Sequence, residues 1–232
     1  MTTPGSATTI GASRFQAKHL LFVILGLLTL FVLYKNERFI IDHQSQDWQY
    51  YFPVRWWLLP HGLAGATVLF LGASQFSNRL RQRRLRLHRA LGRCYVIGVA
   101  IAAPLGIYLA IIHDPVPLRT VVFVQASSWM LTTAIAFFCI RSGNVQLHRQ
   151  WMMRSYAVTT IFVVSRVLDA IPAALGRLDT GTNPSMIWIC NVLAWVVPTL
   201  ILRWPAIFRR ETTPKQNTKA LPSAQNLQNF IS

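Results

Sequence analysis

Residues 79–112, RLRQRRLRLHRALGRCYVIGVAIAAPLGIYLAII, decide the fold of this chain. The first half is crowded with arginines up to Arg93, and the part from Leu91 to Ile112 is a long apolar run without an acidic residue. A helix of about 20 apolar residues crosses the hydrocarbon core of a bilayer, and arginines gather at the cytoplasmic end of such helices. The stretch therefore predicts a transmembrane helix that begins at the cytoplasmic face.

The composition of the whole chain also indicates a membrane-embedded protein. Of the 232 residues, 53% are hydrophobic and 13% are charged, whereas a soluble domain carries roughly 25% charged residues. Apolar runs that are candidates for crossing a bilayer occur at Leu20–Tyr34, Trp56–Phe76, Leu91–Ile112, Val121–Ile140, Met152–Ile171 and Ser185–Leu202. The first run is short, and its basic flanks without a cleavage site indicate an uncleaved anchor. The predicted fold is an all-α, six-helix transmembrane bundle.

The charges are distributed unequally between the two ends of these runs. The formal net charge is +16. With the N-terminus inside, most basic residues fall on the cytoplasmic side, and almost every acidic residue falls outside, namely Glu37, Asp42, Asp47, Asp114 and Asp179. Because basic residues remain in cytoplasmic loops, both termini are predicted to be cytoplasmic.

The chain is predicted to contain one helical domain between two disordered tails. Residues 1–18 and 211–232 are treated as tails, since Thr, Ser, Gln, Asn and Pro are frequent near both ends and cannot bury enough apolar surface to order the chain. Residues 19–210 form the transmembrane domain, because no linker or change of composition divides the apolar runs.

A short motif occurs twice, each time at the start of an apolar run. Leu87-His88-Arg89 is followed by Arg93 and Tyr95, and Leu147-His148-Arg149 is followed by Arg154 and Tyr156. The two copies are compatible with a duplicated helical hairpin of the parallel kind found in membrane folds. Chance similarity between arginine-rich helix starts explains them equally well.

The repeat places His88 and His148 at the same predicted depth, which is the arrangement that a metal or heme held between two helices needs. Gly92, one turn after His88, leaves room for a flat ring, and Arg89 and Arg149 are candidates to bind heme propionates. We therefore identify His88 and His148 as candidate heme or metal ligands. The alternative is that these histidines and arginines anchor their helices at the headgroup level.

A second polar set lies near the predicted outer ends of the runs. Its members, called here the outer polar cluster, are His61, Gln125, Arg166, Asp169 and Asn191. Ionisable groups inside a membrane are costly and usually face a partner or a cavity. The cluster is either a binding pocket or a structural set of mutually satisfied groups.

The arginines between 79 and 93 connect two spans on the predicted cytoplasmic face, where anionic lipid headgroups attract them. No nucleic acid is expected as a partner, since the stretch has no aromatic interleaving and no known binding motif. Cys94, Cys139 and Cys190 lie within apolar runs without the spacing of a disulfide framework or a zinc site.

Several of these motifs together resemble a known family. They are His61-Gly62 with Gly65, Leu71–Phe76, Leu87–Tyr95, and His148–Ala157 with Arg166. The stretch from His61 to Arg166 is similar to the bacterial membrane family called domain of unknown function 2306. This resemblance implies a multi-helix protein of the bacterial cell inner membrane and no established activity.

A more distant similarity exists to the cytochrome b561 and ferric-reductase architecture, in which paired histidines on neighbouring helices ligate b-type heme. His88 and His148 match one such pair, but the fourth run contains no histidine, so one heme at most is implied. We expect electron transfer through one b-type heme, with a quinone or another redox partner. The alternatives are a non-enzymatic protein that binds lipid or a partner helix, and a small transporter that uses the outer polar cluster.

Overall fold

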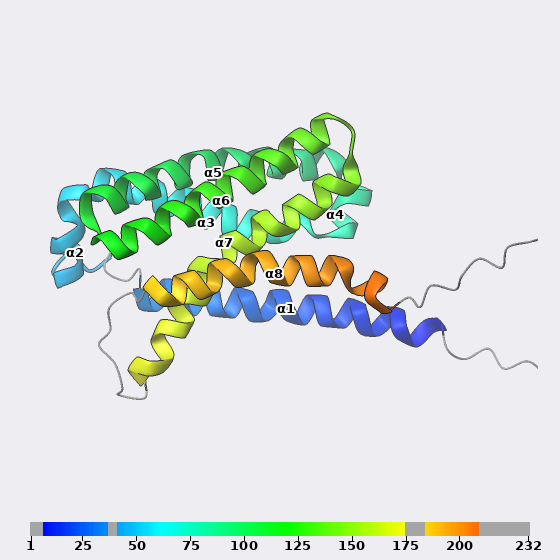
Figure 1. Cartoon of the computed structure of the whole chain (residues 1–232), viewed down its shortest axis with the longest axis horizontal. Helices are drawn as coiled ribbons and strands as arrows, with labels where there is room; N and C mark the ends of the chain where they lie inside the picture. Colours follow the sequence, from blue (N-terminus) through cyan, green and yellow to red (C-terminus); the bar gives the residue numbers. More distant parts are fainter. Residues whose placement is uncertain (1–6, 37–40, 175–183, 209–232) are drawn as a thin grey trace, which may run out of the picture. The chain divides into compact units, whose positions relative to one another are not determined.

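The computed structural model describes residues 7–36, 41–174 and 184–208, and these ranges contain helices and no β-strand. The elements are α1 (Ala7–Asn36), α2 (Gln46–Tyr51), the 3₁₀ turn η2 (Phe52–Val54), α3 (Arg55–Gln75), α4 (Asn78–Arg83), α5 (Leu85–His113), α6 (Val116–Arg141), α7 (Val145–Ala174) and α8 (Pro184–Phe208) (Figure 1). The chain divides into two compact units, Met1–Thr199 and Leu200–Ser232. The side-chain contacts that position the candidate sites all lie within the first unit.

Four stretches of the described chain are long and apolar enough to cross a membrane. They are Trp48–Gln75, Leu85–His113, Val116–Arg141 and Pro184–Arg203. The first predicted run corresponds to the shorter apolar helix Phe22–Lys35. The fifth corresponds to α7, which has the length of a span but is not among the four, because His148, Arg149, Arg154, Arg166 and Asp169 lower its hydropathy. An all-helical, membrane-embedded protein is therefore confirmed, and the six-span count stays a prediction.

The predicted tails are only partly within the described chain. α1 begins at Ala7, so residues 7–18, which we expected to be disordered, are helical in the structure. Six of these twelve residues are good helix formers, namely Ala7, Ala12, Arg14, Gln16, Ala17 and Lys18. Residues 211–232 lie outside the described residues.

Short connections make α5, α6 and α7 antiparallel neighbours. α5 packs along α3 and α6, and α6 packs along α7. Between α6 and α7, Gly143 has a φ of 77°, and the N–H of Asn144 donates to the Cys139 carbonyl at 2.9 Å. This is the usual left-handed glycine end of a helix. The Asn144 side chain then accepts the N–H of Leu147 at 3.0 Å and starts α7.

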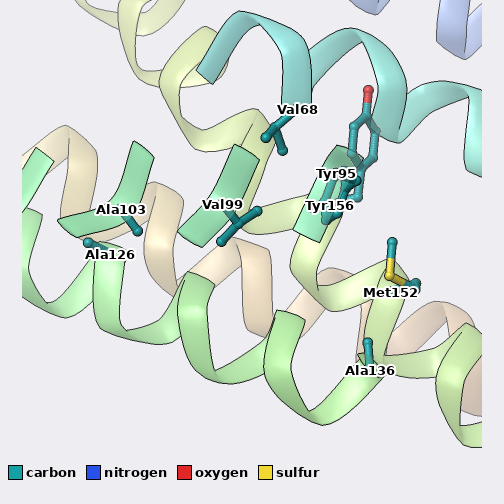
Figure 2. Packing of buried hydrophobic residues seen from close by; sticks show 8 residues of the cluster. All are labelled: Val68, Tyr95, Val99, Ala103, Ala126, Ala136, Met152 and Tyr156. Atoms are coloured by element: carbon teal, nitrogen blue, oxygen red, sulfur yellow. The ribbon is translucent and has the colours of Figure 1, made fainter. Parts of the chain in front are cut away.

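The core between α3, α5, α6 and α7 consists of small and β-branched side chains around two tyrosines. The cluster contains Val68, Tyr95, Val99, Ala103, Ala126, Ala136, Met152 and Tyr156 (Figure 2). A Cβ atom on Gly72 of α3 would collide with the rings of Tyr156 and Tyr95. A Cβ on Gly98 of α5 would likewise collide with Val68. The helices therefore approach closely at small residues, as is common in membrane bundles.

A buried network of hydroxyl groups joins α5, α6 and α7 beside this core. The Tyr95 hydroxyl lies 2.7 Å from Ser155 Oγ and 2.9 Å from Thr159 Oγ1. Thr133 Oγ1 lies 2.7 Å from Ser155 Oγ. Tyr95 and Ser155 have no exposed surface. We call Tyr95, Thr133, Ser155 and Thr159 the hydroxyl network.

Candidate functional site

His88 and His148 occupy equivalent positions in their helices. Each is the fourth residue of its helix, α5 or α7. The N–H of His88 donates to the carbonyl of Arg84 at 3.0 Å, and the N–H of His148 donates to that of Asn144 at 3.0 Å. Both side chains are half-buried, and an electrostatic interaction links the two imidazoles. The repeated motif thus brings both histidines to neighbouring helix starts.

The His148 ring is oriented by a hydrogen bond to the adjacent helix. Its Nδ1 lies 2.8 Å from the carbonyl oxygen of Ala136 in α6. A carbonyl oxygen only accepts, so Nδ1 carries a proton, and the neutral form of the ring then has its lone pair on Nε2. Histidines that ligate metals are commonly held in this way by a backbone carbonyl at the other ring nitrogen.

The His88 ring is less constrained. Its Nδ1 is buried and makes no hydrogen bond to any residue that the structure describes. Besides His148, the charged groups with which it interacts are the guanidinium groups of Arg81 and Arg89. Guanidinium groups disfavour a charged imidazolium, so their proximity favours a neutral ring that has a lone pair for a ligand.

The remaining predicted residues of this site have different surroundings. Gly92 is opposite Gln75, the last residue of α3, because a Cβ on Gly92 would lie 3.3 Å from Gln75 Oε1. The expected space beside His88 is therefore bounded by an amide. Arg89 and Arg149 are exposed, as a residue that binds a polar group at the membrane surface would be.

The described chain holds no group of three or more His, Cys, Asp or Glu side chains that could bind a metal ion. A site built from several protein ligands, like a structural zinc site, is excluded within those residues. A bis-histidine heme site needs only two side chains from the protein, so this absence does not bear on it.

The structure describes separate hydrogen bonds for two members of the outer polar cluster. His61 Nδ1 lies 2.8 Å from the Ala102 carbonyl and its ring packs on Gly106, so His61 joins α3 to α5. Asn191 Nδ2 donates to Ile187 in its own helix at 3.0 Å. The hydrogen bonds described for His61 and Asn191 thus go to backbone carbonyls of neighbouring residues.

Electrostatic interactions connect other members of the outer polar cluster to residues near the α5–α6 connection and in α8. Asp169 interacts with Cys190, the neighbour of Asn191. Arg166 interacts with Asp114, the residue that ends α5. The Arg166 guanidinium also lies 5.9 Å from the centre of the Phe162 ring.

Comparison of the sequence with models of known protein families identifies the family of this chain. A family model described as "Predicted membrane protein (DUF2306)" matches residues 58–205, more than half of the chain. The chain belongs to the DUF2306 family. The match begins near His61, as expected, and continues beyond Arg166 into α8. No curated protein and no solved structure matches, so the similarity to cytochrome b561 stays a prediction.

In this DUF2306 protein, our interpretation of the sequence missed the hydroxyl network. The repeat contained a sign of it, since Tyr95 and Ser155 each follow a repeated histidine by seven residues. Residues seven apart lie on the same face of a helix, two turns away. The hydrogen bond between Tyr95 and Ser155 therefore lies about two turns farther along α5 and α7 than the two histidines. It joins the faces of the two helices that carry these histidines.

The sequence interpretation also assigned no site to the polar residues where α5 connects to α6 in this DUF2306 protein. Asp114 is half-buried there and interacts with His113, Arg119 and Arg166. Burial raises the pKa of the Asp114 carboxyl above its ordinary value, and the three basic neighbours oppose this effect only in part.

Proposed function

We propose that this protein carries electrons within the membrane through one b-type heme bound by His88 and His148. The observation that supports this best is that His88 and His148 occupy equivalent positions at the starts of α5 and α7, close enough for their imidazoles to interact electrostatically. The orientation of His148 by the Ala136 carbonyl adds to it, because the bond leaves Nε2 for ligation. A heme bound there supplies reversible one-electron chemistry of iron.

The residues around the pair suit a heme in several respects. His88 and His148 supply two imidazoles from two helices, as a bis-histidine site needs. Arg89 and Arg149, next to the ligands in sequence, supply charges for the two propionates at the membrane surface. Gln75 borders the site opposite Gly92 and adds an amide that can donate or accept a hydrogen bond.

The experiment that tests this proposal is an optical spectrum of the detergent-purified protein after expression with ample heme precursor. We expect a reduced-minus-oxidised difference spectrum typical of bis-histidine b-type heme. His88→Ala and His148→Ala should each abolish it. His43→Ala is the control, because the His43 ring packs on Trp48, with 4.5 Å between ring centres, and is not part of the site. A wild-type protein that is folded and colourless would contradict the proposal.

We also propose six spans, with both termini on the cytoplasmic side of a bacterial inner membrane. The polar helix α7 contacts α1, α3 and α6, and these contacts let it cross without exposing its polar side chains to lipid. Arginines concentrate at the α4 end of the bundle, which supports the cytoplasmic assignment of that end.

Reporter fusions test this orientation directly. At a position between Arg81 and Arg86, a reporter that works only in the cytoplasm should be active, and one that works only outside the cytoplasm should be inactive. One inserted between Gln44 and Tyr50 should be active only as an external reporter, because these residues are separated from the first position by the single predicted span in α3. An external signal from the first position would reverse the topology and place the histidine pair at the outer face.

A further inference from the structure

A shallow pocket lies on the surface between α5 and α6, at the end of the two helices that is opposite to the histidine pair. Its lining consists of Ile107, Ile111, Arg119, Thr120 and Phe123, and we call it the Arg119 groove. Ile111 and Phe123 are 51% and 55% exposed, so the groove opens toward the surroundings of the bundle. Both helices are candidate membrane spans, so these surroundings are acyl chains.

The polar residues of the groove lie near the α5–α6 connection, and the apolar residues lie farther from it. Arg119 and Thr120 belong to the first turns of α6, close to the α5–α6 connection. Ile107 and Phe123 lie about two turns from that connection, on α5 and α6. The groove therefore has its charge at the membrane surface and an apolar floor toward the membrane interior. This order matches a phospholipid, in which the headgroup comes first and the acyl chain follows.

Arg119 retains hydrogen-bonding capacity for a ligand. One terminal nitrogen donates to the Asp114 carbonyl at 3.2 Å, while its buried Nε has no hydrogen-bond partner among the described residues. The neighbouring Nε2 of His113 is also buried without such a partner. Buried polar atoms of this kind usually find a partner in a protein, a water molecule or a ligand.

The local charge favours an anion. Arg119, Arg166 and His113 all interact with Asp114. Asp114 is the one acid among these groups, and burial raises the pKa of its carboxyl. At the same end of the bundle, the rings of Tyr50 and Tyr51 pack on His113 at 4.2 Å and 5.1 Å between ring centres. Tyrosines are typical of the level of lipid headgroups.

From these observations we infer that the Arg119 groove binds one anionic phospholipid, with the phosphate at Arg119 and an acyl chain along Ile107, Ile111 and Phe123. This site is separate from the histidine pair and does not depend on heme. Arginine suits it, since a guanidinium group forms strong hydrogen bonds to phosphate oxygens.

Native mass spectrometry of the full-length protein tests this inference. Delipidated protein in detergent is titrated with phosphatidylglycerol and, separately, with phosphatidylcholine. Wild type should bind one phosphatidylglycerol in preference to phosphatidylcholine, and Arg119→Gln should bind it about tenfold more weakly, as the loss of one charged hydrogen-bond partner predicts. Ile111→Trp should weaken both lipids, because an indole fills the groove and leaves Arg119 in place.

Arg55→Gln is the matched control. Arg55 belongs to the start of α3, where its guanidinium donates to the Phe52 carbonyl at 2.7 Å and lies over the Phe52 ring at 3.7 Å. Its loss should leave lipid binding unchanged. Equal binding by Arg55→Gln, Arg119→Gln and wild type would overturn the inference. The inference would also be overturned if a quinone copurified with the wild-type protein and neither phospholipid displaced it.

Discussion

Tyr95→Ala is expected to remove most of the folded protein. The Tyr95 side chain is fully buried in the core between α3, α5 and α7 and also anchors the hydroxyl network. Removing a buried aromatic ring costs about 3–5 kcal/mol, through lost contacts and the cavity that remains. This is a large part of the stability of an ordinary domain. The monodisperse yield in detergent and the thermal unfolding midpoint of the purified protein measure the effect.

Tyr95→Phe separates the ring from its hydroxyl group. The network makes five contacts, three between hydroxyl groups and two to the carbonyls of Trp129 and Ser155. Four hydroxyl groups supply only four hydrogens, so one contact always lacks a hydrogen. Removing the Tyr95 hydroxyl leaves three contacts and three hydrogens, so each of the three remaining hydroxyl groups can still donate.

We therefore expect Tyr95→Phe to cost only about 0.5–1.5 kcal/mol. Tyr108→Phe is the control, since Tyr108 lies on the same helix and is 42% exposed. It should leave the unfolding midpoint unchanged. Similar midpoints for Tyr95→Ala and Tyr95→Phe would mean that the ring is not part of the core.

Gly72→Ala has the second large effect that we expect. The added Cβ would collide with the rings of Tyr156 and Tyr95, and both rings are held by buried hydrogen bonds, Tyr156 to the Leu69 carbonyl at 3.2 Å. Overpacking of this kind costs about 1–3 kcal/mol. Thermal unfolding in detergent should show a lower midpoint.

Gly65→Ala is the matched control for this change. Gly65 lies two turns earlier in α3, and nothing is within 4 Å of the position that its Cβ would occupy. Alanine also favours a helix by about 1 kcal/mol over glycine, so Gly65→Ala should keep or raise the midpoint. If both substitutions lowered it equally, the close approach of α3 to the two tyrosines would be wrong.

The positions of the helices along the chain could be predicted well from the sequence. Long apolar runs give three of the four candidate spans to within a few residues, because hydropathy is a local property. The span that ends at Gln75 reaches back to Trp48, farther than its apolar run, since α2, η2 and α3 follow one another without an interruption. The start of α1 was missed, since a helix can continue beyond its apolar part where the residues allow it.

For the histidine site, the sequence predicted the positions along the helices but not the neighbours across them. The repeated motif placed His88 and His148 at equivalent helix starts, and the structure has them there. It could not show that Gln75 lies opposite Gly92, because this depends on how α3 is rotated against α5. Rotation also decides the partners of the outer polar cluster, such as the contact of His61 with the Ala102 carbonyl. Whether the cluster is a pocket or a structural set stays a prediction.

The polarity of α7 has a consequence for the biogenesis of this protein. Ser155, Thr159 and Ser165 are buried, and α7 also carries Arg154, Arg166 and Asp169. A translocon releases a segment into lipid according to its own transfer free energy, to which a central arginine or aspartate contributes an unfavourable 2.5–3.5 kcal/mol, approximately. If α7 is a span, as we propose, these residues raise the cost of releasing it into lipid alone. We then expect α7 to insert together with the preceding apolar helices, so that the bundle assembles during synthesis rather than after it.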